Sequence, residues 1–212
     1  MTHFGNSCYA WDVVNDAMAD DGSYRQSFWY KKTGKEYISA AYKAANAVRK
    51  ELDLKVRLYY NDYNINIANK KSDAVLEMVT GLRNVSNWVD AVGFQSHYNN
   101  NDSSIAVGAD IFWNLRRFTI NRMDVAITEL YVKTSTANPT VSEQQQQVGI
   151  MTNVVSACKK TKRCVGVSTW DFVDTYSVVN SSAPLLFYQP DGPNTPLVRK
   201  ATYDAVTAGW IL

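Results

Sequence analysis

The chain has 212 residues, of which 46% are hydrophobic, 12% aromatic and 20% charged, a composition that excludes an intrinsically disordered chain. Its 22 basic residues nearly balance 20 acidic ones, and no Lys/Arg cluster dominates one stretch, so we expect no nucleic-acid binding. No apolar run reaches the roughly 18 residues of a transmembrane helix, and the first residues lack the basic and apolar regions of a signal peptide. We therefore expect no membrane association and no signal peptide in this chain.

Short apolar runs alternate with longer segments of helical periodicity along the whole chain. We expect five strands, at 8–15, 55–62, 91–97, 124–132 and 164–172. A helix follows each of them in the chain, at 28–52, from a Ser72 cap through Leu82, at 109–121, from Ser142 to about Lys160, and at 196–209. Pro196 suits the first turn of the last helix. Apolar strands that alternate with helices predict a parallel α/β sheet. No linker or repeat divides the sequence, so we expect one domain over 1–212.

Each predicted strand ends with polar or aromatic side chains suited to chemistry. They are Asn15 and Asp16, then Asn61, Asp62 and Tyr63, then Gln95 and His97, then Glu129, and finally Trp170 and Asp171. Functional groups at successive strand ends are typical of a β/α barrel, whereas a doubly wound sheet binds ligands mainly at one switch point. No glycine-rich phosphate-binding motif is present, so nothing in the sequence favours nucleotide binding.

Cysteine usage bears on the cellular compartment. Cys158 and Cys164 are separated by a basic, turn-like spacer that fits either a short disulfide loop or two free thiols, and the pair is too sparse for a zinc site. Cys8 is left unpaired. Glycosylation sequons begin at Asn84, Asn101 and Asn180. Together these features favour an oxidising, extracellular setting.

Two acidic residues are candidates for chemistry. Asp16 and Glu129 each lie at the end of an apolar strand, where an ionised carboxylate is costly without a partner or a purpose. Glycoside hydrolysis needs two carboxyl groups that flank the scissile bond. The alternative is that Asp16 caps a helix beginning near Ala17, and that Glu129 pairs with a nearby Arg or Lys.

Five ordered motifs carry a family resemblance. Residues 11–17 read W-D-V-V-N-D-A, residues 58–64 L-Y-Y-N-D-Y-N, residues 92–97 V-G-F-Q-S-H, residues 127–130 I-T-E-L, and residues 165–172 V-G-V-S-T-W-D-F, followed by D-T-Y-S at 174–177. This pattern resembles glycoside hydrolase family ten, the retaining endo-β-1,4-xylanases, from Tyr9 to Trp210. The resemblance implies a partial TIM (β/α)8 barrel whose five β/α units correspond to strands 4–8. It further implies secretion, xylan or a xylo-oligosaccharide as ligand, and no metal or other cofactor. Cys158 and Cys164 fall where fungal members carry a short disulfide loop.

The resemblance implies roles for the residues around the cleavage point. Glu129 takes the position of the nucleophile, and Asp16 takes the position of the acid/base residue. Asn15 would bind the 2-hydroxyl of the sugar, while Gln95 and His97 would orient and polarise the nucleophile.

The resemblance also implies a lining for the sugar-binding cleft. Trp170 would form an aromatic floor beneath the sugar at the cleavage point. Tyr63 and Asn61 would line the leaving-group side. Each of these side chains could otherwise be an ordinary core or structural residue.

Four departures from the family pattern qualify this interpretation. Asp16 stands where the family has Glu and is shorter by about 1.5 Å, which predicts weak protonation of poor leaving groups. Tyr131 replaces the Asp or Asn that helps to anchor the catalytic-site histidine, so we expect the tautomer and orientation of His97 to be less secure. Val178 replaces a second cleft tryptophan. The first three β/α units have no counterpart in the chain.

These departures leave three hypotheses open. The chain is a retaining xylanase of weak activity, a catalytically impaired sugar-binding or decoy protein derived from one, or an incomplete chain without independent function. Five strands cannot close an eight-stranded barrel, so we expect exposed edges at 8–15 and 164–172. A second copy or a partner chain would then cover those edges.

Overall fold

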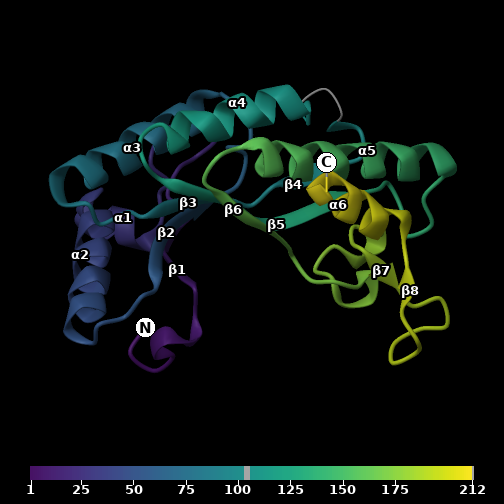
Figure 1. The fold of residues 1–212 in the computed structure, drawn as a ribbon, viewed down its shortest axis with the longest axis horizontal. Helices are drawn as coiled ribbons and strands as arrows, with labels where there is room; N and C mark the ends of the chain where they lie inside the picture. Colours follow the sequence, from purple (N-terminus) through teal and green to yellow (C-terminus); the bar gives the residue numbers. More distant parts are fainter. Residues whose placement is uncertain (103–105, 212) are drawn as a thin grey trace.

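The computed structural model describes residues 1–102 and 106–211 (Figure 1). The expected sequon at Asn101 ends at Ser103, which lies outside the described residues. No helix in the described part of the chain has the length and apolar content to cross a membrane.

A curved, parallel sheet forms the centre of the molecule. Its strands are β1 (Ala10–Asn15), β2 (Arg57–Asp62), β3 (Ala91–Phe94), β5 (Asp124–Lys133) and β6 (Cys164–Thr169), hydrogen-bonded in that order. The short β4 (His97–Asn99) pairs in parallel with the far end of β5. The five predicted strands are therefore present. The predicted strand at 91–97 is interrupted, because Ser96 adopts a left-handed backbone with φ of 63°.

Helices cover the convex face of this sheet, as Figure 1 shows. They are α1 (Phe28–Thr33), α2 (Glu36–Glu51), α3 (Lys70–Ser86), α4 (Gly108–Thr119), α5 (Val141–Lys160) and α6 (Ala201–Ile211). The short 3-10 helices η1 (Gly5–Ser7), η3 (Asp174–Tyr176) and η4 (Asn180–Ser182) lie in connecting segments. The antiparallel pair β7 (Phe187–Tyr188) and β8 (Val198–Arg199) precedes α6.

Three helix boundaries differ from the prediction. The helix predicted at 28–52 is two helices, because Gly34 caps α1 with φ of 65°. Helix α3 begins at Lys70 because the side chain of Asn69, not Ser72, accepts the capping hydrogen bond. The last helix begins at Ala201 and not near Pro196, because Val198 and Arg199 are extended in β8.

The hydrophobic core lies between the convex face of the sheet and its helices. Outward-facing side chains such as Val92, Phe94, Val125 and Ile127 are buried there. A small, separate apolar cluster of Tyr59, Ala91 and Ala126, with Ala10 beside it, lies on the concave face. Within the described residues, β1 pairs only with β2, and β6 pairs only with β5. The fold is thus a partial β/α barrel with two open edges.

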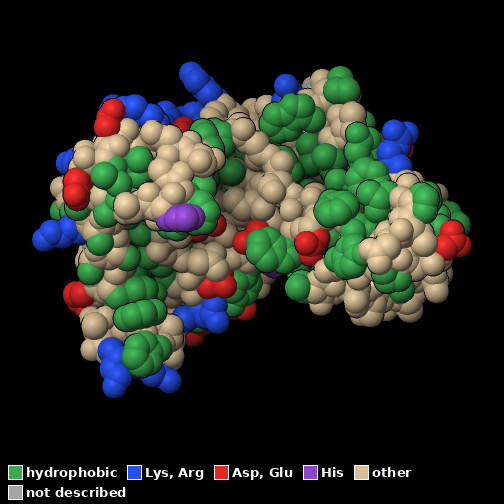
Figure 2. Space-filling model, turned by 90° about the horizontal axis from the view of Figure 1, so that it is seen from below, with side chains coloured by type: hydrophobic (Ala, Val, Ile, Leu, Met, Phe, Trp, Pro, Cys, Tyr) green, Lys and Arg blue, Asp and Glu red, His purple; other side chains and the backbone are tan. Residues whose placement is uncertain are grey.

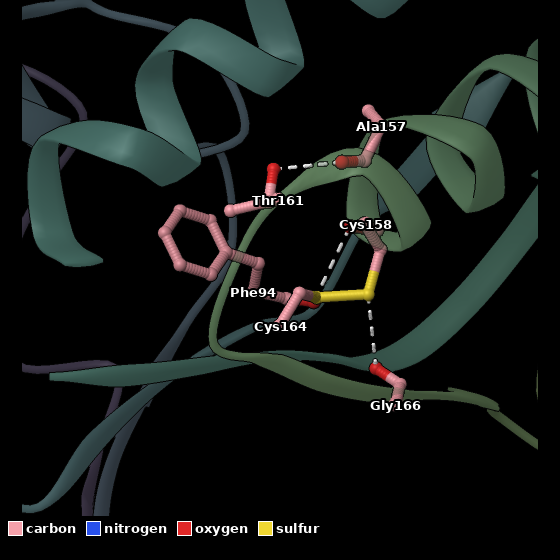
Figure 3. Close-up of a disulfide and its surroundings, with 7 residues drawn as sticks. Phe94, Ala157, Cys158, Thr161, Cys164 and Gly166 are labelled. Atoms are coloured by element: carbon pink, nitrogen blue, oxygen red, sulfur yellow. Dashed lines mark hydrogen bonds between the residues drawn. A yellow bond between two sulfur atoms is a disulfide. The ribbon is translucent and has the colours of Figure 1, made fainter.

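Cys158 and Cys164 form a disulfide that joins the end of α5 to the start of β6 (Figure 3). This confirms the disulfide interpretation and excludes the two free thiols. Thr161 turns the connecting loop, and its hydroxyl donates to the Ala157 carbonyl at 2.7 Å. Cys8 is a free thiol.

Candidate active site

The carboxyl ends of the parallel strands gather the predicted functional side chains at one end of the sheet. Asn15 ends β1, Asn61 lies near the end of β2, Gln95 follows β3, and Glu129 lies within β5. Figure 2 looks onto the open, concave side of the molecule, where acidic side chains lie around the middle of a hollowed face.

Glu129 is held by two polar side chains, one on β2 and one on β4. Nδ2 of Asn61 donates to its Oε1 at 2.8 Å, and Nε2 of His97 lies 3.1 Å from its Oε2. The Glu129 side chain is only 14% exposed. The alternative pairing of Glu129 with Arg or Lys is absent among residues 1–102 and 106–211. Both carboxylate oxygens are therefore positioned by a histidine and an amide instead.

Asp16 follows β1 in a left-handed conformation with φ of 54°. Nε2 of Gln95 donates to its Oδ1 at 2.8 Å, and a guanidinium nitrogen of Arg25 lies 3.4 Å from its Oδ2. The proposed helix cap at Asp16 is wrong, because the next helix begins only at Phe28. The following backbone is anchored instead by the phenol of Tyr60, which accepts from Ala17 N at 3.1 Å.

A continuous set of hydrogen bonds connects the two carboxyl groups. Oδ1 of Asn15 accepts from Nε2 of Gln95 at 3.2 Å and from Nδ2 of Asn61 at 3.0 Å. Gln95 also donates to Asp16, and Asn61 also donates to Glu129. With His97, which contacts Glu129, six of the predicted site residues thus form one network, and Asn15 is exposed at its centre.

Asn61 occupies a different place from the expected one. We expected it along the leaving-group side of a cleft, yet it is 1% exposed and lies against Glu129. Its Oδ1 accepts from the Thr128 hydroxyl at 2.7 Å, which leaves Nδ2 facing Glu129 and Asn15. Asn61 therefore connects strands β1, β2 and β5 below the surface of the site.

A buried ion pair supports the end of β2. Nζ of Lys71, on α3, lies 2.9 Å from Oδ1 of Asp62, and both side chains are excluded from solvent. Burial raises the pKa of Asp62, while its hydrogen bonds from Tyr60 and Lys71 oppose that rise. The same ammonium lies 3.2 Å from the ring centroid of the half-buried Tyr63. Lys71 thus fixes both Asp62 and Tyr63.

The aromatic side chains differ in how they are held. His97 and Tyr131 stack with 4.4 Å between ring centroids and 11° between ring planes. Trp170, just after β6, is 45% exposed, and its backbone N–H donates to the Leu130 carbonyl. Val178 is 75% exposed. Trp170 is therefore free to contact a ligand, and Val178 adds no aromatic wall.

Sequence reasoning missed several residues that shape this site. Lys71 lies on α3, far from any strand end, and no spacing rule marks it. Gly93 and Thr128 sit inside strands and matter only through their contact with Asn61. Asp12, earlier on β1, lies close enough to Glu129 that desolvation, followed by the charge of Glu129, raises the pKa of Asp12. The W-D-V motif contained that signal, because a carboxylate within an apolar strand is unusual.

A groove borders the site on the side of β1. This groove of about 720 Å³ runs beside Asn15 and Asp16, between β1 and the first two helices, and its lining includes Trp29 and Tyr37. Within the described residues, no group of three or more His, Cys, Asp or Glu side chains is placed to hold a metal ion.

Comparison with known proteins identifies relatives of this chain. The family model for glycosyl hydrolase family 10 matches residues 1–208. Endo-1,4-beta-xylanase D of Talaromyces funiculosus is 39% identical over 84% of this chain and 42% of its own length. An endo-1,4-beta-xylanase of Agaricus bisporus is 34% identical over 99% of this chain and 60% of its own length. The chain thus spans about half the length of these curated relatives.

Solved structures of family 10 xylanases superpose on nearly the whole chain. A family 10 xylanase of Bispora sp. MEY-1, solved with xylobiose, superposes with a TM-score of 0.93 at 41% identity, over 98% of this chain and 64% of the other. An endo-1,4-beta-xylanase of Penicillium canescens superposes with a TM-score of 0.90 at 36% identity, over 99% and 62% of the two chains. These structures share the partial barrel and extend beyond it.

Proposed function

The chain belongs to glycosyl hydrolase family 10, and from that membership we propose that it carries the catalytic residues of a retaining endo-1,4-β-xylanase. The observation that supports this most is the hydrogen-bond network that joins Asp16 and Glu129 through Gln95, Asn15 and Asn61. A pair of positioned carboxyl groups is what glycosidic-bond cleavage requires.

In the first step, an oxygen of Glu129 attacks the anomeric carbon of the sugar and forms a glycosyl ester. Asp16 gives a proton to the departing glycosidic oxygen, so the leaving sugar departs as a neutral alcohol. The donors from His97 and Asn61 fix the direction of the Glu129 lone pairs. Asn15, exposed between the two carboxyl groups, would bind the sugar 2-hydroxyl.

In the second step, Asp16 accepts a proton from water, which attacks the anomeric carbon and releases Glu129. Two displacements at the same carbon leave the anomeric configuration unchanged. Protonation and attack use only carboxyl groups and water, so the mechanism requires no metal or other cofactor. The exposed Trp170 would stack against the apolar face of the sugar ring.

We propose xylan and xylo-oligosaccharides as the ligands. Two structural relatives, from Bispora sp. MEY-1 and from Thermotoga petrophila, were solved with xylobiose at 41% and 29% identity to this chain. We also propose an extracellular location, because the Cys158–Cys164 disulfide suits an oxidising compartment. The open edges at β1 and β6 would be covered by further β/α units, a partner chain or a second copy.

A specific observation favours a second candidate, a sugar-binding protein of impaired catalysis. Asp16 has the short side chain, and the Arg25 guanidinium lies beside it. Both of its carboxyl oxygens are already occupied, Oδ2 by Arg25 and Oδ1 by Gln95, so a leaving group must compete for them. Binding residues such as Trp170 and Asn15 would remain functional even if protonation failed.

One assay separates the two candidates. The full chain is tested on an aryl β-xylobioside with an activated leaving group and on polymeric xylan, beside the Glu129→Gln variant. We expect rapid release of the aryl alcohol, slow xylan hydrolysis, and loss of at least about 1,000-fold in the variant. If neither substrate reacts while xylan still binds, the sugar-binding candidate is supported instead.

A further inference from the structure

The stacked pair of His97 and Tyr131 arises from strand register. In the parallel pairing of β4 with β5, His97 lies directly opposite Tyr131. Opposed residues on neighbouring strands project to the same face, so the two rings meet. Their centroids are 4.4 Å apart and their planes are nearly parallel, at 11°.

This stack contacts the group that lies against Glu129. Nε2 of His97 is 3.1 Å from Oε2 of Glu129. In the part of the chain that the structure describes, this is the only hydrogen bond made by the imidazole ring. A single hydrogen bond fixes one atom and leaves the ring free to rotate about it. The face of Tyr131 removes that freedom by setting the plane of the imidazole.

The surrounding backbone holds β4 in place for this contact. Ser96, in its left-handed conformation, is fully buried, and its hydroxyl donates to Oδ1 of Asn66 at 2.9 Å. The carbonyl of Ser96 accepts from the N–H of Tyr131 at 3.4 Å. The turn before His97 is thus tied directly to the residue on which its ring stacks.

Tyr131 is suited to act as an uncharged surface. Its ring is half-buried, and burial, followed by the negative charge of Glu129, raises the pKa of its phenol. The phenol therefore stays protonated at neutral pH and places no second negative charge beside Glu129.

We infer that Tyr131 is a positioning residue that holds the His97 imidazole against Glu129 by ring stacking. This inference rests on the proposed role of Glu129 as the nucleophile. It assigns Tyr131 an effect on the rate of glycosyl transfer and little effect on the binding of substrate. The aromatic face, and not the hydroxyl, carries the effect.

The chain allows a direct test because it contains only two histidines, His3 and His97. A His3→Gln background leaves one imidazole to observe by proton NMR, and His3 lies in the N-terminal segment against Phe4. In that background, Tyr131→Phe keeps the aromatic face, while Tyr131→Leu keeps much of the bulk without it. The ring current of residue 131 shifts the His97 C–H resonances upfield.

We expect the upfield shift to persist in Tyr131→Phe and to vanish in Tyr131→Leu. On the activated aryl β-xylobioside, we expect kcat to fall by about 10- to 100-fold in Tyr131→Leu, with KM within about 2-fold, and to stay within about 3-fold in Tyr131→Phe. The inference is overturned if Tyr131→Leu has the same kcat as the chain with Tyr131, or if kcat falls as far in Tyr131→Phe as in Tyr131→Leu. It is also overturned if the His97 resonances show no upfield shift when Tyr131 is present.

The two readouts separate this inference from the proposed function. The NMR measurement reports the stacking whether or not the chain is active. If Glu129→Gln retains full activity, the proposed nucleophile is wrong and the kinetic part of the inference is overturned with it. If Glu129→Gln is inactive and Tyr131→Leu is fully active, only the positioning role is overturned.

Discussion

Asn61 reaches Glu129 by crossing directly over Gly93. Nδ2 of Asn61 donates to Oε1 of Glu129 at 2.8 Å. A Cβ atom on Gly93 would lie 2.3 Å from Oδ1 of Asn61 and 2.8 Å from Cγ2 of Thr128. Because Gly93 has no side chain, the amide of Asn61 on β2 can pass over β3 and donate to the Glu129 carboxylate on β5.

Gly93→Ala is expected to displace Asn61 and to disrupt its hydrogen bond to Glu129. We expect hydrolysis of the activated aryl β-xylobioside to fall by about 10- to 100-fold, and the free energy of unfolding to fall by about 1–3 kcal/mol. Gly166→Ala on β6 is the matched control, since nothing lies within 4 Å of the Cβ it would add. Equal activities of the two variants would contradict the role of the close approach at Gly93.

Lys71 is expected to be among the most important charged residues for stability. Lys71→Met leaves the Asp62 carboxylate buried without its cation, which costs about 3–5 kcal/mol of unfolding free energy in comparable sites. Lys55→Met is the control, because the pair of Lys55 with Asp53 is almost fully exposed and should contribute under about 1 kcal/mol. Urea unfolding of both variants measures the difference. Similar losses in both would show that the buried pair is not stabilising.

The destabilisation in Lys71→Met should depend on pH. Burial raises the pKa of Asp62 in the folded chain above its ordinary value, and removal of Lys71 takes away a group that opposes this rise. Because the folded state then binds the proton more tightly than the unfolded state, the penalty is present at neutral pH. It is relieved as pH falls through the raised folded pKa toward the ordinary value of about 3.9. The difference in unfolding free energy between wild type and Lys71→Met should therefore become smaller between pH 7 and pH 4. Adding Asp62→Asn to both proteins should make this difference independent of pH.

The disulfide should stabilise the end of α5. Replacing both cysteines, Cys158→Ser with Cys164→Ser, removes a short covalent loop, and loop entropy predicts a loss of about 2 kcal/mol. Cys8→Ser is the control, since Cys8 is a free thiol. Reductant should destabilise the wild-type chain by the same amount and leave the double variant unchanged. A double variant as stable as wild type would contradict this expectation.

The fold was predictable because its signals are local and repeated. Each strand carries a run of apolar residues, most continuously where both faces are buried, as in β2 and β3, and a polar break separates each strand from the next helix. Helix boundaries were less predictable because neighbouring residues compete for the same role. Asn69 and Ser72 are both good caps, and only the direction of the chain entering α3 decides in favour of Asn69.

Only the site residues near the carboxyl ends of strands could be predicted from the sequence. Asn15 ends β1 and Gln95 follows β3, and Glu129 reaches the same edge of the sheet from within the longer β5. The stacking of Tyr131 on His97 depends on the register between β4 and β5, which no local pattern records. Because Tyr131 replaces the Asp or Asn of the family pattern, the sequence suggested that the His97 imidazole is poorly anchored. In the structure the Tyr131 ring stacks on that imidazole.

The short side chain of Asp16 gives the most direct test of the proposed mechanism. Its carboxylate already contacts Gln95 at 2.8 Å and Arg25 at 3.4 Å. Asp16→Glu extends the carboxyl group by about 1.5 Å, and a displacement of this order changes rates by about 100-fold when a proton must be delivered. We expect xylan hydrolysis to rise by about 10- to 100-fold. Release from the activated aryl β-xylobioside should stay within about 3-fold, because a good leaving group needs little protonation.

Asp16→Asn is the matched control, because it keeps the size of the side chain and removes the proton. It should abolish xylan hydrolysis while the first aryl release persists as a burst, since Glu129 can still attack but no base activates water for the second step. If Asp16→Glu leaves xylan hydrolysis unchanged while Asp16→Asn abolishes it, side-chain length does not limit the reaction. The contact of Arg25 with the carboxylate would then be the remaining structural cause of slow xylan hydrolysis, and Arg25→Gln, which frees Oδ2, should raise that rate where the longer acid did not.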